Sequence, residues 1–192
     1  MNPAESEKNF EKLDYSVTPL PKGEYESCRF VSCDFSNTDL SDCKFIDCEF
    51  KGCNLSLAKL KNTALQDIWF RDCKMLGLHF EHCREFGLSF SFENCILNHC
   101  SFYKLKIKKT TFCNSQLKET DFTECDLSVS LLENCDLLHA TFEKSNLEKT
   151  DFRTSYNYSI DPEMNRIKKA KFSLVGVSGL LDKYDIEIES LE

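Results

Sequence analysis

The chain has 192 residues, of which 41% are hydrophobic, and it carries a formal net charge of −8. This length suffices for one domain with a sizeable core, and no apolar run reaches the roughly 18 residues that a membrane helix needs. The polar N-terminus lacks the basic and apolar segments of a secretory signal. We therefore expect a cytoplasmic protein whose twelve cysteines stay reduced.

Residues 1–9 are expected to form an N-terminal tail, because the dominant pattern of the chain starts at residue 10. Every fifth residue from there is bulky and apolar. The first series is Phe10, Tyr15, Leu20, Tyr25, Phe30, Phe35, Leu40, Phe45, Phe50, Leu55, Leu60, Leu65, Phe70, Met75 and Phe80. After a shift of two residues the pattern resumes at Phe92 and runs to Phe152. A period of five fits neither an α-helix nor a strand, but it fits a solenoid whose chain turns a corner every five residues.

The cysteines follow the same period. A small residue is preferred two positions before each bulky one, and every cysteine except Cys113 occupies this slot. Thr38, Ala58 and Ser130 take the slot elsewhere, and a metal site would not exchange its ligands for such residues. We therefore expect the cysteines to be small, buried packing residues that bind no metal and form no disulfide.

Three stretches carry a resemblance to a known family. They are "NTDLSDCKF", "LKETDFTECDL" and "SNLEKTDFRTS", and they resemble the consensus A(D/N)LXX of the pentapeptide-repeat proteins. The resemblance covers residues 10–155 and implies an all-β fold, the right-handed quadrilateral β-helix. The bulky and small residues of each repeat would fill a narrow core, and the repeats would form about seven coils.

The segment "FEHCREFGLSFSF" breaks the period near residues 81–91. The two extra residues form either a bulge at one corner of the coil or an exposed recognition loop. Arg84, Glu85 and Phe86 are the candidate partner-binding residues of such a loop.

Residues 156–192 differ in composition and are expected to form a terminal coil, a capping helix and a dimerisation tail. The open end of a β-helix exposes apolar core and unpaired backbone, so it requires a cap. Ser173 can begin a short amphipathic helix that covers this end. Leu180, Leu181 and Tyr184 would over-cover the end, and we expect them to join two tails in a homodimer.

The stretch "IDPEMNRI" in this tail is similar to the segment that closes the repeats of microcin-immunity proteins of the McbG type, relatives of the Qnr quinolone-resistance proteins. This resemblance implies a dimer joined at its C-terminus. It also implies a bacterial type II topoisomerase, gyrase or topoisomerase IV, as the partner, which the protein would protect from a quinolone- or microcin-type poison. The alternative is an interaction scaffold whose partner is unrelated to topoisomerases.

The sequence contains no catalytic motif. Phosphate-binding, hydrolase and metalloprotease signatures are all missing, and the four histidines are expected on outward slots of different coils. We therefore expect a binding protein without enzymatic activity, cofactor or metal, and one that does not span a membrane.

The negative net charge disfavours direct binding to nucleic acid and suits a basic groove of a DNA-binding partner. In the topoisomerase-binding relatives the rod is thought to resemble DNA, so acidic groups are the candidate contacts. They form one set nearer the N-terminus, Asp34, Asp39 and Asp42, and a second set, Asp121, Glu124 and Asp126. No continuous acidic stripe is expected, and Lys104, Lys106, Lys108 and Lys109 cluster on neighbouring faces, which speaks against simple DNA mimicry.

Overall fold

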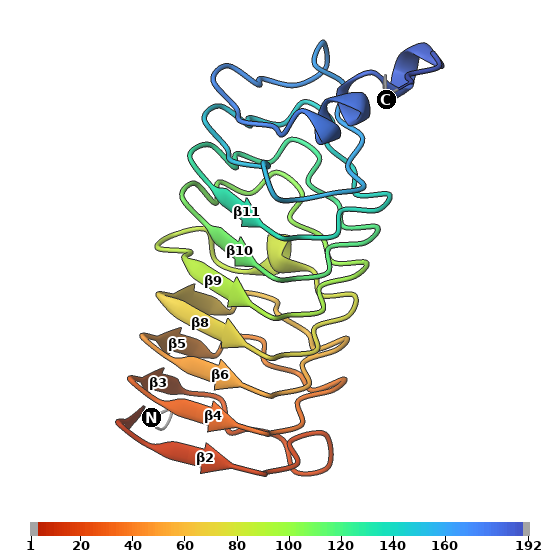
Figure 1. Cartoon of the computed structure of the whole chain (residues 1–192). Helices are drawn as coiled ribbons and strands as arrows, with labels where there is room; N and C mark the ends of the chain where they lie inside the picture. Colours follow the sequence, from red (N-terminus) through yellow and green to blue (C-terminus); the bar gives the residue numbers. More distant parts are fainter. Residues whose placement is uncertain (1–3, 190–192) are drawn as a thin grey trace.

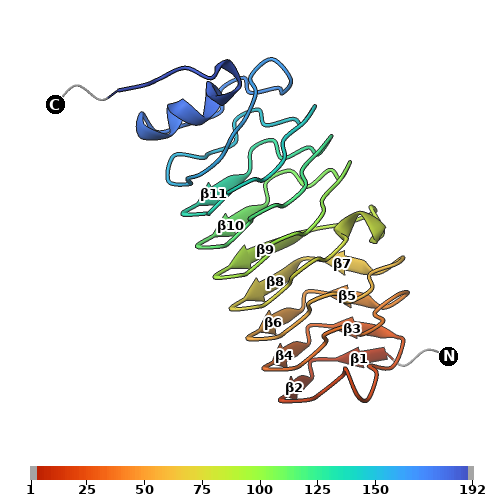
Figure 2. The same cartoon turned by 90° about the vertical axis from the view of Figure 1, so that its right-hand side faces the viewer.

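The computed structural model describes residues 4–189, and these residues wind into a right-handed quadrilateral β-helix (Figure 1). The all-β solenoid expected from the period of five is thereby confirmed. The N-terminal coils lie at one end of the rod and the C-terminal helical segments at the other (Figure 2). Strands on two faces of the coil stack into two parallel sheets along the rod.

The four-stranded sheet contains β1 (Ala4–Ser6), β3 (Glu24–Glu26), β5 (Lys44–Ile46) and β7 (Ala64–Gln66). The seven-stranded sheet contains β2 (Asn9–Glu11), β4 (Arg29–Val31), β6 (Glu49–Lys51), β8 (Ile68–Arg71), β9 (Phe90–Glu93), β10 (Thr111–Cys113) and β11 (Leu131–Glu133). It spans about six turns, close to the seven expected. Isolated bridges from Leu131 to Asp151 and from Asp151 to Lys171 continue its ladder.

The paired backbone starts earlier than the pattern of bulky residues. β1 lies within the expected tail 1–9 and pairs in parallel with β3, and the amide of Glu7 donates to the carbonyl of Glu26 at 3.0 Å. The inward position of this strand is Glu5, which is only partly buried. Because the pairing uses backbone groups, it does not need the apolar side chain by which the period was recognised.

Bulky side chains fill the core in stacked columns. On the seven-stranded sheet, successive rings stack face to face between Phe10 and Phe30 at 4.8 Å, Phe30 and Phe50 at 4.8 Å, and Phe50 and Phe70 at 5.2 Å. Offset stacking and edge contacts of aromatic rings add to the free energy gained by burial. The columns therefore make every coil depend on its two neighbours.

The position two residues before each bulky residue, which we call the small slot, explains why the cysteines recur in the core. Eleven of the twelve are buried, and only Cys113 is partly exposed. The Cys33 thiol donates to the carbonyl of Phe10 at 3.3 Å, and in the same geometry the Thr38 hydroxyl donates to the carbonyl of Tyr15 at 3.0 Å. Cysteine, threonine and serine exchange at this slot because each is small and supplies one donor to a core-facing carbonyl of the coil before. All twelve thiols are free.

The phase break forms a short 3₁₀-helix, η1 (Phe80–His82), followed by a loop over 84–89. Before it the chain pairs residues twenty apart, and across it residues twenty-two apart, as Phe70 pairs with Phe92. The loop supplies no fully buried central residue, and Phe90, which occupies a slot usually held by a small residue, packs against the Phe80 ring at 5.3 Å. The two extra residues thus leave the solenoid as a surface loop while the core stays continuous.

The cap is built from two 3₁₀-helices, η2 (Val175–Leu180) and η3 (Asp182–Tyr184), rather than from an amphipathic α-helix. The amide of Gly176 donates to the Ser173 hydroxyl at 3.0 Å, so Ser173 begins the segment as expected. Gly176 and Gly179 rest against Tyr158, and a Cβ on Gly179 would lie 2.1 Å from the Tyr158 carbonyl oxygen. Only glycine allows this close approach. The spacing of the apolar residues predicted an α-helix because it carries no information about this glycine contact.

Candidate partner-binding surface

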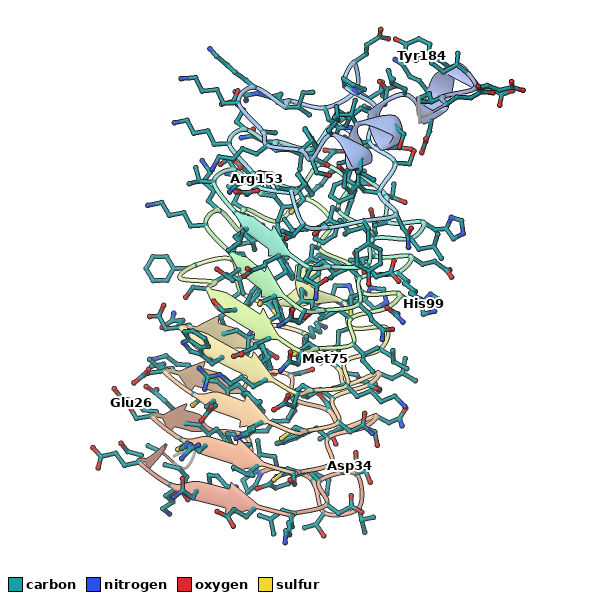
Figure 3. All side chains as sticks on the ribbon, viewed as in Figure 1. Glu26, Asp34, Met75, His99, Arg153 and Tyr184 are labelled. Atoms are coloured by element: carbon teal, nitrogen blue, oxygen red, sulfur yellow. The ribbon has the colours of Figure 1, made fainter. Side chains whose placement is uncertain are left out.

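The first acidic set is anchored locally on the N-terminal coils. Asp34 accepts the amide of Ser36 at 2.7 Å, and Figure 3 shows Asp34 on the outside of the rod. Asp39 accepts the amide of Ser41 at 2.8 Å and lies 3.1 Å from the Lys22 ammonium. The hydrogen bonds from Ser41, followed by the contact with Lys22, lower the pKa of Asp39 to about 2. These carboxylates are ionised at neutral pH, and the charge of Asp39 is already partnered.

The second acidic set meets the lysine cluster, which the sequence had suggested as a separate feature. The Glu124 carboxylate lies 3.7 Å from the Lys104 ammonium, and Asp126 lies 3.3 Å from that of Lys108. The signal for these pairs was the spacing of about twenty residues, which places each partner on the next coil. These two pairs offset part of the charge of each group, and Asp121, Lys106 and Lys109 take part in no ion pair among residues 4–189.

The loop over 84–89 brings its three candidate residues to the surface together. All three are exposed, and the Phe86 side chain is 89% exposed. The loop is tied to the coil before it: Arg84 Nε donates to Asn62 Oδ1 at 2.8 Å, and the Ser89 hydroxyl donates to Asp67 Oδ1 at 2.9 Å.

Gly87 completes the loop with a positive φ of 72°, and a Cβ there would come within 2.7 Å of Gln66 Nε2. Because these contacts fix the backbone on both sides, the loop presents Phe86 with little entropy left to lose on binding. A fully exposed phenyl group on a fixed loop is a typical anchor for a protein partner.

The tail candidates are mostly engaged within the chain. Leu180 packs against the core, and Leu181 is partly buried. The Tyr184 hydroxyl donates to Glu163 at 3.1 Å, and Lys183 lies between Asp161 and Glu163 at 2.8 and 2.7 Å. The apolar side chains that η2 and the residue before it leave most exposed are Leu174 and Val175, at 92% and 90%, and Val177 is exposed to a smaller extent.

One set of surface residues was missed by sequence reasoning. We call it the ionic edge: the corner where the chain passes from β1 to β2, from β3 to β4, and so on up the rod. Its acidic part is Glu7, Glu26, Asp47 and Asp67, and its basic part is Lys109, Lys149, Lys168 and Lys169. The loop carrying Phe86 lies between the two parts. The signal was charge at or beside one corner slot, acidic before the loop and basic after it, with an interruption at Val129. It appears only when the coils are aligned.

Metal ligands and membrane-spanning helices were both sought among the residues that the structure describes. Among residues 4–189, no group of three or more His, Cys, Asp or Glu side chains is placed to hold a metal ion. His79 and His82 stack at 5.3 Å, and His79 faces Glu81 at 2.8 Å. None of the helices described between residues 4 and 189 is long and apolar enough to cross a bilayer.

Comparison with known proteins supports the architecture. The structure resembles three solved structures of QnrB1, a plasmid-mediated fluoroquinolone resistance protein. A trypsin-treated variant has a TM-score of 0.64 at 20% identity and covers 97% of this chain and 100% of its own. The full-length form has a TM-score of 0.53 at 18% identity, covering 96% and 100%. A second trypsin-treated variant has a TM-score of 0.51 at 21% identity, covering 96% and 99%.

At the level of sequence, no curated protein matches significantly. The family model of the pentapeptide repeat region, however, matches residues 24–91 and 88–157. Together these matches cover most of the solenoid on both sides of the phase break. The chain belongs to the pentapeptide repeat family.

Proposed function

We propose that this protein is a non-enzymatic, cytoplasmic binding protein that contacts a bacterial type II topoisomerase, gyrase or topoisomerase IV, and protects it from a quinolone- or microcin-type poison. The observation that carries the proposal is the likeness to QnrB1, a fluoroquinolone resistance protein, over 97% of this chain and all of that structure. The likeness includes the length of the rod, so both chains offer a partner a surface of similar extent.

The loop over 84–89 is the contact that we assign to this partner. It departs from the smooth surface of the solenoid, and it combines the exposed phenyl ring of Phe86 with the charges of Arg84 and Glu85. The surrounding coils are rigid, so the partner meets a preformed surface. Simple DNA mimicry contributes little, because Asp39, Glu124 and Asp126 are each paired with a lysine.

A supercoiling assay tests the proposal. Gyrase is incubated with increasing fluoroquinolone in the presence and absence of the protein, and binding is measured separately by surface plasmon resonance. We expect the protein to bind gyrase and to raise the drug concentration needed for inhibition. Phe86→Ser should weaken both effects, whereas Tyr156→Ser, which alters another exposed aromatic side chain, should leave them unchanged. Absence of binding by the wild-type protein would overturn the proposal.

The second candidate is an interaction scaffold for a partner unrelated to topoisomerases. It is favoured by the mixture of both charges on the rod, because a basic DNA-binding groove would repel the exposed lysines at 108 and 109. Capture of a different protein from a bacterial lysate, lost with Phe86→Ser, together with no effect on gyrase would select this candidate.

A further inference from the structure

The ionic edge is complementary to itself. The loop before β9 has four rungs of the ladder on its N-terminal side, those of β8, β6, β4 and β2. It also has four on its C-terminal side, those of β10, β11 and the bridges at Asp151 and Lys171. Asp67 lies one rung before the loop and Lys109 one rung after it. Glu7 lies four rungs before and Lys169 four rungs after. At one, three and four rungs from the loop the edge thus carries opposite charges, whereas at two rungs Asp47 lies opposite the uncharged Val129.

These charges have no oppositely charged partner among the residues that the structure describes, although Asp47 and Asp67 accept hydrogen bonds from the Ser27 and Ser89 hydroxyls. In residues 4–189, none of Glu7, Glu26, Asp47, Asp67, Lys109, Lys149, Lys168 and Lys169 takes part in an ion pair, and all are exposed. Figure 3 shows Glu26 on this edge, directed away from the rod. The edge also differs from the neighbouring face, where Arg29 and Glu49 pair at 2.7 Å. An unpaired acidic half and an unpaired basic half thus share one straight edge.

The centre of the edge carries apolar as well as polar groups. Phe86 projects from the loop, and a depression of about 290 Å³ lies beside it. The depression is lined by Ile68, Trp69, Leu88 and Phe90, with Lys108 and Lys109 at its rim. Phe86 does not fill the depression of its own chain, because its side chain is 89% exposed. Asp67, Ser89, Ser91 and Thr110 complete the lining, so the centre offers an exposed phenyl ring and a hollow whose walls are part apolar and part polar.

We infer that the ionic edge binds a second copy of this chain, with the two rods antiparallel and a twofold axis passing through the loops. A twofold interface uses the same patch on both copies, so it requires opposite charges at equal distances from the axis and an element at the axis that can contact itself. Asp67 of each copy then faces Lys109 of the other, Glu7 faces Lys169, and each Phe86 enters the depression of the other copy. The inference does not depend on the proposed partner.

The strength of this contact follows from its shape. Nine rungs at the spacing of neighbouring strands, about 4.8 Å, give an edge of roughly 38 Å. It is only two residues wide, so the buried area falls below the about 800 Å² per partner of a standard interface. We therefore expect a weak dimer that dissociates as salt is added, because exposed charges are screened over about 8–10 Å near physiological ionic strength.

Charge exchange tests the inference. Full-length Asp67→Lys and Lys109→Asp should each weaken self-association about tenfold in sedimentation velocity at low salt, because each change creates two repulsive contacts per dimer. The two variants mixed together should associate again as a heterodimer, since lysines on one copy then face aspartates on the other at both sites. Lys61→Asp, which makes the same charge change away from the edge, should have no effect.

Three results would overturn the inference. They are a wild-type monomer at all salt concentrations, a mixture of the two variants that stays monomeric, and a dimer that survives Asp67→Lys but is lost when residues 173–192 are removed. The last result would assign the dimer to the tails. Circular dichroism of each variant establishes that it is folded, and the gyrase assay is read separately, so a failed dimer and a failed topoisomerase contact are distinguishable.

Discussion

The two halves of the rod differ on one face. Before the loop, strands cover two faces of each coil, and after it they cover only one, because the four-stranded sheet ends with β7 while the other continues through β9, β10 and β11. Figure 2 shows β1, β3, β5 and β7 only in the N-terminal half. The coils on both sides keep the same period, so the difference must arise within the pentapeptide.

The residue before the inward position contributes to the difference. On the face that loses its strands, this residue is Glu24, Lys44 or Ala64 in the N-terminal half. In the C-terminal half it becomes Asp126 and then Asn146. Their side-chain oxygens accept the amides two residues later, at 3.0 and 3.3 Å. Such local hydrogen bonds favour a turn over an extended strand. This slot thus favours the turn at Asp126 and Asn146, whereas Lys106, which occupies it in the first coil after the loop, forms an isolated bridge without such a bond.

The core does not share this difference. Across the loop, Phe70 stacks on Phe92 at 5.3 Å and Phe80 on Phe102 at 4.6 Å. We therefore expect the largest effect from a charge placed in either half. Phe45→Asp and Leu127→Asp, which change residues of 0% exposure, should each destabilise the fold by more than about 4 kcal/mol.

Because the core is continuous, each variant should unfold the whole rod in one transition, as monitored by circular dichroism during urea denaturation. A variant in which one half melts early while the other keeps the wild-type midpoint would show that the loop divides the rod into two cooperative units.

The C-terminal half ends under the cap formed by η2 and η3. The contact of Gly179 with Tyr158 in this cap should have the next largest effect on stability. Gly179→Ala should destabilise the protein by about 1–3 kcal/mol, because the new methyl group would overlap the Tyr158 carbonyl and lift η2 from the coil end. Ser178→Ala, at an exposed neighbouring position, serves as the control. Equal melting temperatures for the two variants would mean that the cap is not held in this position.

Each half of the rod also contains a position with positive φ at which a substitution should stabilise the protein. Val129 and Leu57 occupy the corner slot with φ of 64° and 59°, a region that costs residues with a Cβ roughly 1–2 kcal/mol. Asparagine tolerates this conformation, so Val129→Asn should raise the free energy of unfolding by about 1 kcal/mol. Leu57→Asn should give a smaller gain, because only valine is β-branched. Denaturation that ranks the two variants in the opposite order would contradict this explanation.

The smallest effect is a dependence on acid. Hydrogen bonds from Arg153 lower the pKa of Asp151 from its usual 3.8 to about 2. A carboxylate with a lowered folded-state pKa stabilises the fold above its unfolded pKa, and this contribution disappears as the pH falls from about 4 to about 2. Asp151→Asn should therefore flatten the loss of stability over this range.

Asp39→Asn in the other half is the matched variant. Asp39 also has a pKa of about 2, but its side chain is 56% exposed against 14% for Asp151, so solvent screens its interactions and the flattening should be weaker. Stability measured between pH 2 and 7 checks both variants, and identical acid profiles for the two would contradict the role of burial.

Much of the fold could be predicted because the period of five is carried by side chains that face the core. Phe10 to Phe80 and Phe92 to Phe152 all lie at inward positions, and the cysteine slot followed from the same register. β1 could not be predicted in this way, because its pairing uses only backbone groups. The cap was expected, but its 3₁₀ geometry depends on the contact of Gly179 with Tyr158.

The candidate surface was predicted less well, because the partners of a charged side chain depend on which residues the stacking of the coils brings together. The pairs of Lys104 with Glu124 and of Lys108 with Asp126 join residues that are far apart in the chain. The ionic edge likewise appears only in the aligned corners. By contrast, Phe86 was found from the break in the period alone, since a residue that leaves the repeat is free to leave the core.

Thiol labelling tests the central claim, a continuous solenoid whose small slots face the core, most directly. Burial raises the pKa of Cys48, Cys100 and Cys135 to about 12, and Cys113 is the one cysteine outside the slot. A thiol reagent added to the native protein at neutral pH should modify Cys113 slowly and the other eleven only after denaturation. If Cys113→Ser abolishes the labelling of the folded protein, the labelled thiol is that of Cys113. Rapid labelling of several cysteines in the folded protein would contradict the inward register and with it the fold described above.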